Sequence, residues 1–223
     1  SRVLGTGVLA RALAGLDRPP PVLVSASAVG YYGDRGNEIC TEESGPGKGF
    51  LAEVVKAWEA AAAPAARAGI RVVNARIGVV LSAAGGALAQ MLLPFQIGIG
   101  GRLGGGKQYV SWVDADDVLG LLLHAVRTPG MRGPMNVTAP LPVTNAVFTN
   151  TLGRVLGRPT VVPVPGFALK ALFGEMATEL LLHGQRVRPA YAEASGYEFL
   201  FSTLEDSLRF QLGRERPEGA DAA

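Results

Sequence analysis

The chain has 223 residues, of which 48% are hydrophobic, so it is long enough to bury a sizeable core. Its 21 Lys and Arg residues nearly balance its 19 Asp and Glu residues, and no block of like charge indicates a nucleic-acid or anionic-membrane partner. The sequence shows no membrane-spanning run and no signal-peptide pattern, and its single cysteine, Cys40, cannot form an internal disulfide. These features predict a cytoplasmic protein.

Predicted strands and helices alternate along the chain. The strand patterns cover residues 19–28, 70–81, 107–113 and 133–139. The helix patterns cover residues 4–16, 49–69, 87–100, 114–126 and 144–157. Such alternation favours a Rossmann-like α/β fold, in which a parallel sheet carries helices on both faces.

Several local signals refine these elements. In the helix over residues 49–69, Phe50, Val54, Trp58 and Ala62 follow one face, and Pro64 should kink or split it. The acidic residues at 114, 116 and 117 are typical of a helix start, which is a simpler explanation than cation binding.

The C-terminal part of the chain predicts a further helix after Pro163 to Pro165. Its spacing of apolar residues should place one helical face over the ligand cleft or against the sheet; that face consists of Leu169, Leu172, Phe173 and Met176. A last segment over residues 196–212 precedes a tail that has the composition of a disordered end.

The run "VLVSASAVGYYGD", residues 22–34, changes from apolar residues to hydroxyl groups and aromatic rings where a buried strand ends. Open α/β sheets bind ligands beyond the carboxyl ends of their strands. Because side chains alternate along a strand, Ser25 and Ser27 should share one face, with the Ser27 hydroxyl at the end that faces a ligand. The alternative is a serine that bonds a nearby backbone group.

Other motifs carry less weight. Gly5-Thr6-Gly7 does not follow a strand, and residues 101–107 match a phosphate loop but lack the Ser or Thr and the helix that should follow. Gly78 lies where a strand leaves the sheet, which suits either a ligand contact or a plain turn. His124 and His183 have no neighbouring ligand residues, so no metal site is predicted.

Six motifs in order resemble an epimerase-like family, an atypical branch of the extended short-chain dehydrogenase/reductases. They are "SRVLGT", "SASAVGYYGD", "FLAEVVKAWE", "RIGVVL", "MLLPFQIGIGGRLGGGKQYVSWVDADDV" and "GPMNVTAP". The family's C-terminal module of unknown function is similar to the segment from Val162 to Leu208. Members are described as nucleoside-diphosphate-sugar epimerases or, loosely, as cell-division inhibitors. The resemblance extends from Ser1 to about Leu212.

The resemblance implies a set of site residues. Ser27 would be catalytic and would bond the reacting oxygen. Tyr31 or Tyr32 is the candidate to replace the family's missing proton donor; the alternative is that one ring packs in the core and the other lines the pocket. The cofactor would be NADP, with NAD as the alternative, and its contacts would be Arg2, Ser25, Gly30, Gly78 and Val80. A small-molecule substrate, for which a nucleotide-sugar is one candidate, would contact Gln108, Tyr109 and Trp112.

The sequence departs from the family in two ways. The first strands and the glycine-rich fingerprint of a dinucleotide-binding sheet are absent, which predicts an incomplete sheet and a chain that by itself binds NADP poorly. The superfamily's Tyr-x-x-x-Lys pair is also absent, because the residue four positions before Lys56 is Ala52 and not a tyrosine. The side chain of Lys56 should also face solvent.

Three functions therefore stay open. The first is an NAD(P)-dependent epimerase or reductase, in which one tyrosine of the Tyr31–Tyr32 pair replaces the missing proton donor. The second is an NADP-binding regulatory or redox-sensing protein without turnover, and the third is an interaction module carried by the C-terminal segment. The expected domains are a Rossmann-like part over residues 1–160, a small α+β lobe over 161–212 and a disordered tail over 213–223. A homodimer is a further expectation.

Overall fold

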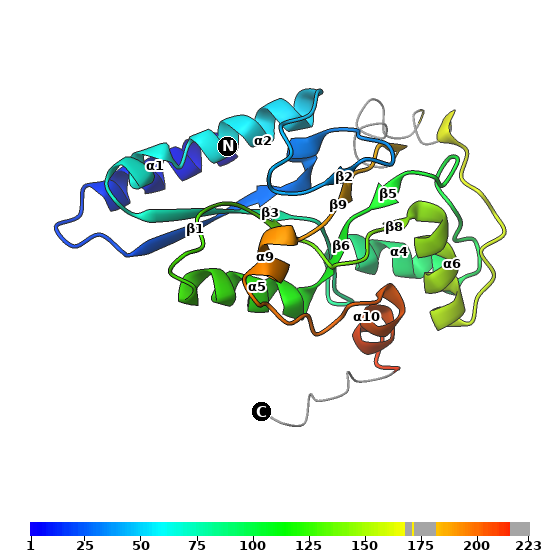
Figure 1. Ribbon diagram of the computed structural model, residues 1–223. Helices are drawn as coiled ribbons and strands as arrows, with labels where there is room; N and C mark the ends of the chain where they lie inside the picture. Colours follow the sequence, from blue (N-terminus) through cyan, green and yellow to red (C-terminus); the bar gives the residue numbers. More distant parts are fainter. Residues whose placement is uncertain (168–170, 172–181, 215–223) are drawn as a thin grey trace.

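The computed structural model describes residues 1–167, 171 and 182–214 (Figure 1). The predicted helix face formed by Leu169, Leu172, Phe173 and Met176 lies outside the described residues, as does most of the predicted tail.

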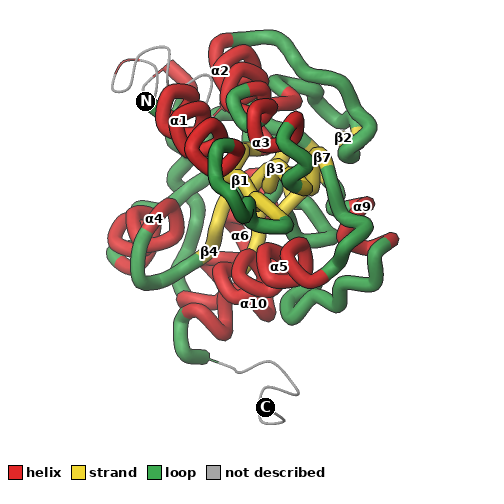
Figure 2. Tube along the Cα trace, turned by 90° about the vertical axis from the view of Figure 1, so that its left-hand side faces the viewer, coloured by secondary structure: helices red, strands yellow, loops and turns green. Residues whose placement is uncertain are grey.

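The core of the fold is a parallel sheet in the order β1-β3-β7. Its strands are β1 (Val22–Ala28), β3 (Arg71–Ile77) and β7 (Gly133–Val137). Helices α1 (Arg2–Ala14), α2 (Phe50–Ala60) and α3 (Ala63–Arg67) cover one face, and α5 (Ala115–Arg127) covers the other (Figures 1 and 2). The predicted α/β fold with helices on both faces is thereby confirmed.

Strand β1 shows the predicted period of two. Ser25 and Ser27 are buried, whereas Ala26 between them is exposed. The two serines therefore share one face of the sheet, as expected from strand geometry. The register continues across the sheet, because Ser27 lies opposite Arg76 of β3, which lies opposite Asn136 of β7.

Gly78 is the point where the chain passes from one sheet to the next. After it, β4 (Val79–Leu81) pairs in parallel with β6 (Trp112–Asp114). The Gly78 N–H donates to the Val137 carbonyl at 3.0 Å, and a Cβ atom at Gly78 would lie 2.2 Å from the Ser111 carbonyl oxygen. Only glycine fits this crossing without a shift of the backbone.

A second group of elements packs beside β4 and β6. It contains α4 (Gly86–Gln96), α6 (Asn145–Leu156) and α10 (Leu204–Gln211), with Trp112, Phe148 and Phe201 in their shared core. The short elements around it are η1 (Val29–Tyr32), β2 (Ile39–Cys40), β5 (Tyr109–Val110), β8 (Val143–Thr144), β9 (Arg186–Val187) and α9 (Ala190–Ala194). Strand β9 pairs with β2, so the C-terminal segment is joined to the loop that follows β1.

Helix α2 buries part of the predicted face. Trp58 and Ala62 are buried as predicted, whereas Phe50, the first residue of the helix, is 74% exposed. The other buried positions of the helix are Ala52 and Val55. The helix does end before Pro64, which lies in the first turn of α3, and Lys56 is exposed as predicted.

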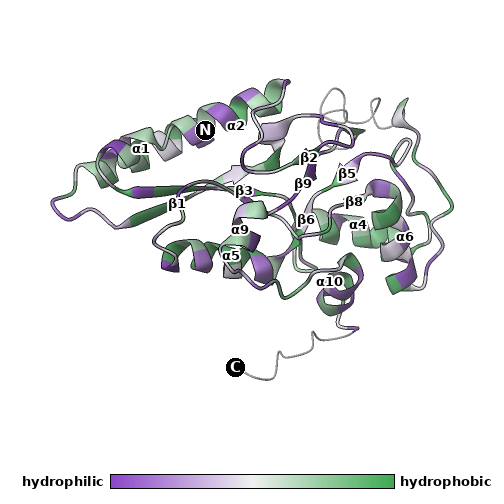
Figure 3. Ribbon diagram, in the orientation of Figure 1, coloured by the Kyte–Doolittle hydropathy of each residue, from purple (hydrophilic) through white to green (hydrophobic). Residues whose placement is uncertain are grey.

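Helix α1 packs through small residues. Gly7 and Ala10 are buried, whereas Leu4 and Val8 are 74% and 61% exposed. Hydrophobic and hydrophilic residues accordingly share its visible surface (Figure 3). No helix among the described residues is long and apolar enough to cross a membrane.

The acidic residues at the start of α5 have structural roles. Asp114 caps the helix by accepting from the Asp116 N–H, and its carboxylate also accepts from Ser207 and Gln211 of α10. Asp117 accepts the backbone N–H groups of Leu200 and Phe201. Within the described part of the chain, no group of three or more potential ligand side chains could hold a metal ion.

Candidate active site

A buried arginine links the carboxyl ends of the three central strands. Arg76 of β3 is 3% exposed, and its guanidinium donates to both carboxylate oxygens of Glu59 on α2, at 2.8 and 2.9 Å. The Ser27 hydroxyl donates to the same Glu59 carboxylate at 2.6 Å. This geometry uses the Ser27 hydroxyl to satisfy a partly buried charge, as buried ions require.

The two tyrosines of η1 pack around the same guanidinium. Tyr32 is fully buried; its hydroxyl accepts from Arg76 at 2.9 Å and donates to Asn136 at 2.7 Å. Tyr31 lies against the guanidinium, with 3.5 Å between the Arg76 Cζ atom and the ring centroid. Burial raises the pKa of Tyr32 to about 12, although the charge of Arg76 and its hydrogen bond act in the opposite direction. Tyr32 is therefore protonated at neutral pH.

Asn136 carries the network to two further segments. Its side-chain amide donates to the Arg188 carbonyl at 2.9 Å, and its backbone N–H donates to Glu42 at 2.9 Å. The loop after β2 and the segment after β9 are thus held against the end of β7. We call the set Ser27, Tyr32, Glu59, Arg76 and Asn136 the Arg76 network.

A cavity of about 370 Å³ opens at the carboxyl ends of β1 and β3. This apolar cavity is walled mainly by aliphatic and glycine residues, among them Ala28, Gly30, Leu51, Val55, Ile77, Gly78, Val79 and Met91. Its polar contributions come from Gln108, Tyr109, Ser111, Asn145, His183 and Gln185. The position is the one at which open α/β sheets bind ligands, and the lining suits a flat or compact molecule with few polar groups.

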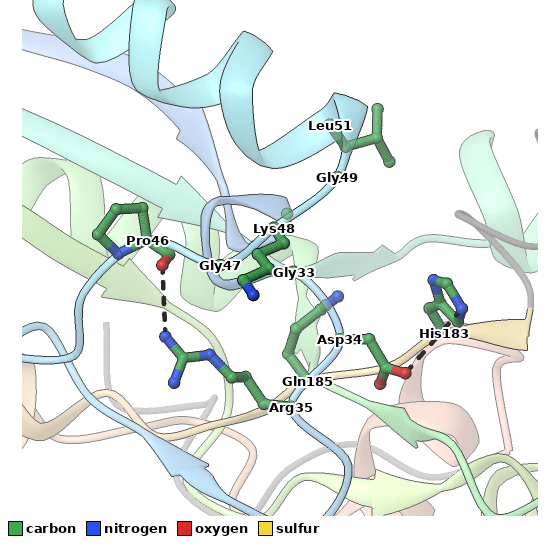
Figure 4. Close-up of a pocket in the computed structure, with 11 residues that line it drawn as sticks. Gly33, Asp34, Arg35, Pro46, Gly47, Lys48, Gly49, Leu51, His183 and Gln185 are labelled. Atoms are coloured by element: carbon green, nitrogen blue, oxygen red, sulfur yellow. Dashed lines mark hydrogen bonds and ion pairs between the residues drawn. The ribbon is translucent and has the colours of Figure 1, made fainter.

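A second cavity of about 560 Å³ adjoins the first. This polar cavity is lined by the Gly33–Arg35 turn, by the Pro46–Gly49 loop, and by four residues that also line the apolar cavity (Figure 4). The four shared residues are Gly30, Leu51, His183 and Gln185. His183 Nε2 lies 4.0 Å from a carboxylate oxygen of Asp34. The two cavities therefore form one site with an apolar and a polar compartment.

Helix α2 presents two aliphatic side chains to the apolar cavity. Leu51 and Val55 line it and are four residues apart, which is the spacing of the superfamily's Tyr-x-x-x-Lys pair. The sequence comparison had placed that pair at Ala52 and Lys56, but Ala52 is buried and Lys56 is exposed. The pair is absent from this helix, and at the same spacing the helix presents Leu51 and Val55 to the cavity.

The predicted catalytic residues lie in the Arg76 network and its surroundings. Ser27 is 3% exposed and bonded to Glu59, so the geometry does not support a hydroxyl that faces the ligand; the next residue, Ala28, lines the cavity instead. Neither tyrosine is among the lining residues of the two cavities. The reason is the charge of Arg76, which needs these groups as partners.

The predicted cofactor contacts divide between the cavity and other places. Gly30 and Gly78 line the apolar cavity, as predicted. Val80 does not: it packs on the opposite side of β4, and its neighbour Val79 lines the cavity. Ser25 is buried one step deeper in β1. Arg2 stacks on the Trp58 ring of α2, with 4.9 Å between its Cζ atom and the ring centroid.

Two of the three predicted substrate residues line the apolar cavity. They are Gln108 and Tyr109. Trp112 is fully buried in the core, where its indole N–H donates to the Leu141 carbonyl at 3.0 Å. Its place follows from strand alternation, because Val110 and Trp112 cannot share a face with Tyr109.

Sequence reasoning missed several lining residues. Gln185 and His183 lie far along the chain from the serine strand, and no local pattern marks them. Lys48 and Asn145 line the polar and apolar cavities respectively. Arg76 did carry a signal, since a charged residue within an apolar strand pattern requires a buried partner.

Comparisons with known proteins find relatives of this chain. The epimerase family protein MT2273 of Mycobacterium tuberculosis is 45% identical over 214 residues, which cover 96% of this chain and 70% of that protein. Human SDR39U1 is 38% identical over 210 residues, covering 94% of this chain and 71% of that protein. This chain belongs to the SDR39U1-like epimerase family, an atypical branch of the short-chain dehydrogenase/reductases.

Solved structures of the family have the same fold. The structure of human SDR39U1 isoform 2 with NADPH superposes with a TM-score of 0.90 at 36% identity, covering 96% of this chain and 73% of that one. A nucleoside-diphosphate sugar epimerase from Corynebacterium glutamicum has a TM-score of 0.81 at 37% identity, covering 100% of this chain and 44% of that one. Residues 164–211 match a family described as a domain of unknown function (DUF1731). These residues include His183 and Gln185.

We expect Ser27→Ala to lower stability rather than to act on a ligand. The change removes a donor from the Glu59 carboxylate, which should cost about 1–3 kcal/mol in the free energy of unfolding. Urea unfolding measures this loss, and Ser202→Ala, an exposed serine, is the control. Unchanged stability together with impaired ligand binding would return Ser27 to the ligand site.

Tyr32 should make the stability of the protein fall at alkaline pH. Its pKa is about 12 in the folded protein and near 10 when unfolded, so its contribution is complete below pH 10 and is lost as the pH rises towards 12. Tyr32→Phe should be less stable than the wild type at neutral pH, and the difference should narrow above pH 10. Urea unfolding across this range tests the prediction, and a constant difference would contradict it.

Proposed function

We propose that this chain forms the nicotinamide and substrate part of an NADP-dependent epimerase or reductase that acts on a small molecule. The observation that carries the proposal is the apolar cavity at the carboxyl ends of β1 and β3. The relatives of this chain support an NADP-dependent enzyme, since the structure of human SDR39U1 was solved with NADPH.

The cavity residues fit a nicotinamide ring. Gly30 and Gly78 leave two backbone segments without side chains at the wall, so that a flat ring can approach them closely. Val79, Leu51 and Val55 offer aliphatic surfaces that exclude water from the ring. When bound, such a cofactor supplies hydride transfer, and the role of these residues is to hold and desolvate it.

The substrate would occupy the rest of the apolar cavity and the adjoining polar cavity. Gln108, Tyr109 and Gln185 offer hydrogen-bonding groups near the ring, and Lys48, Asp34 and His183 offer charged or titratable groups further out. This arrangement suits a small polar molecule. A nucleotide-sugar is the finer candidate, supported by the name of the Corynebacterium relative.

A second candidate function is NADP binding without turnover. It is favoured by Leu51 and Val55, which occupy the cavity wall at the spacing of the missing catalytic pair. Such a protein would serve as a regulator or redox sensor. The interaction-module alternative, the cytoplasmic location and the homodimer stay predictions; one relative, from Arabidopsis thaliana, is named as chloroplastic.

The proposal is tested with reduced nicotinamide mononucleotide, which contains the ring but not the adenosine half of NADPH. The 223-residue chain should bind NADPH weakly, because no strand and glycine loop precede α1 within it. The ring protons of the mononucleotide should nevertheless receive saturation from the protein in saturation-transfer NMR.

Gly30→Val provides the decisive variant. A Cβ atom there meets Leu51 and Val55 at ordinary contact distances of 3.8 and 3.9 Å, so the fold should tolerate it while the ring site is filled. We expect at least tenfold weaker binding of the mononucleotide, or about 1.4 kcal/mol. Gly45→Val, at a glycine with open space around it, should leave binding unchanged. Equal binding by both variants would contradict the proposed site.

A further inference from the structure

Gln185 stands in the wall between the two cavities, and its backbone is held firmly. Its carbonyl oxygen accepts from the Ser111 hydroxyl at 2.6 Å, and the same hydroxyl accepts from the Val187 N–H at 3.0 Å. At Gly184 a Cβ atom would lie 2.4 Å from the Tyr109 carbonyl oxygen, so the chain passes β5 at a distance that only glycine permits. The position of residue 185 is therefore fixed by its neighbours.

The side-chain amide of Gln185, unlike its backbone, is not held by hydrogen bonds to the described residues. It is half-buried and lines both cavities, and no hydrogen bond joins it to another side chain or backbone group of the described residues. The contrast is Gln211, whose amide accepts from the Ala83 N–H and donates to Asp114. Figure 4 shows the Gln185 side chain extending into the polar cavity, with Lys48 and Asp34 on either side of it. A half-buried amide on a fixed backbone is suited to bind a ligand.

The other residues shared by the two cavities are less suited to this role. Gly30 has no side chain and Leu51 has no polar atom, and His183 lies towards Asp34. The hydroxyl of Ser111 is already used twice by the backbone of the Gln185 segment. The Gln185 amide thus lines both cavities, and it has no hydrogen-bond partner among the described residues.

We propose that Gln185 is a substrate-binding residue. Its amide hydrogen-bonds a hydroxyl or carbonyl oxygen of a small molecule that extends from the apolar into the polar cavity. This inference rests on the proposed function and deepens it, because it assigns a role to the segment over residues 164–211. That segment supplies one wall of the site and the group that selects an oxygen-bearing ligand next to the nicotinamide position.

The test uses three probes in saturation-transfer NMR: dihydroxyacetone, glucose and UDP-glucose, each added to the protein with reduced nicotinamide mononucleotide present. At least one probe should bind the wild type. Gln185→Leu keeps a side chain of similar volume but removes the hydrogen bonds of the amide. It should bind that probe about tenfold more weakly. Gln96→Leu, at an exposed glutamine of α4, is the matched control and should bind like the wild type.

The outcomes separate the two proposals. If the mononucleotide binds but no probe does, or if Gln185→Leu binds the probes as the wild type does, the Gln185 proposal is wrong and the proposed function stands. If the mononucleotide itself does not bind, the proposed function fails. The thermal unfolding midpoint of Gln185→Leu should equal that of the wild type, and a clear decrease would show a structural role and overturn the assignment.

Discussion

The charge of Arg76 is the constraint on which the site depends. A guanidinium buried in the middle of a parallel sheet must find a counter-charge and hydrogen-bond acceptors, because breaking a buried pair costs about 3–5 kcal/mol. Glu59 supplies the charge, Tyr32 supplies an acceptor, and the Tyr31 ring covers the guanidinium. The partners come from two places in the sequence: Glu59 lies on α2, and the two tyrosines are neighbours in η1. The hydrogen bonds that Arg76 requires therefore fix the turn after β1 and the orientation of α2. Through Asn136 they also hold the segment at Arg188.

The same constraint decides which groups are left for chemistry. Ser27, which the resemblance predicts to be catalytic, and Tyr32, a candidate proton donor, are buried and bonded within the Arg76 network. The wall of the apolar cavity is built instead from glycine and aliphatic residues. Chemistry in this site would therefore depend on groups brought from other segments, and the C-terminal segment contributes His183 and Gln185 to the wall between the two cavities.

Local patterns predicted the fold well, because strand and helix periods are properties of neighbouring residues. The alternation of Ser25 and Ser27 on one face of β1 follows directly from such a period. A period does not reveal what covers that face, so the partner of Ser27 could not be predicted before α2 was placed. Gln185 could not be found either, since its position depends on a hydrogen bond with Ser111 and on a cavity that it shares with Gly30, both distant in sequence. The predicted domain boundaries stay predictions.

The central claim, that Arg76 holds the turn which forms the cavity wall, is tested most directly by hydrogen exchange of Arg76→Lys. Lysine keeps the positive charge beside Glu59 but loses the paired hydrogen bonds and the stacking on Tyr31. The account predicts that backbone amides of residues 29–33 exchange faster in the variant, while the amides of β1 and β3 stay protected. Unchanged protection of residues 29–33 would contradict it.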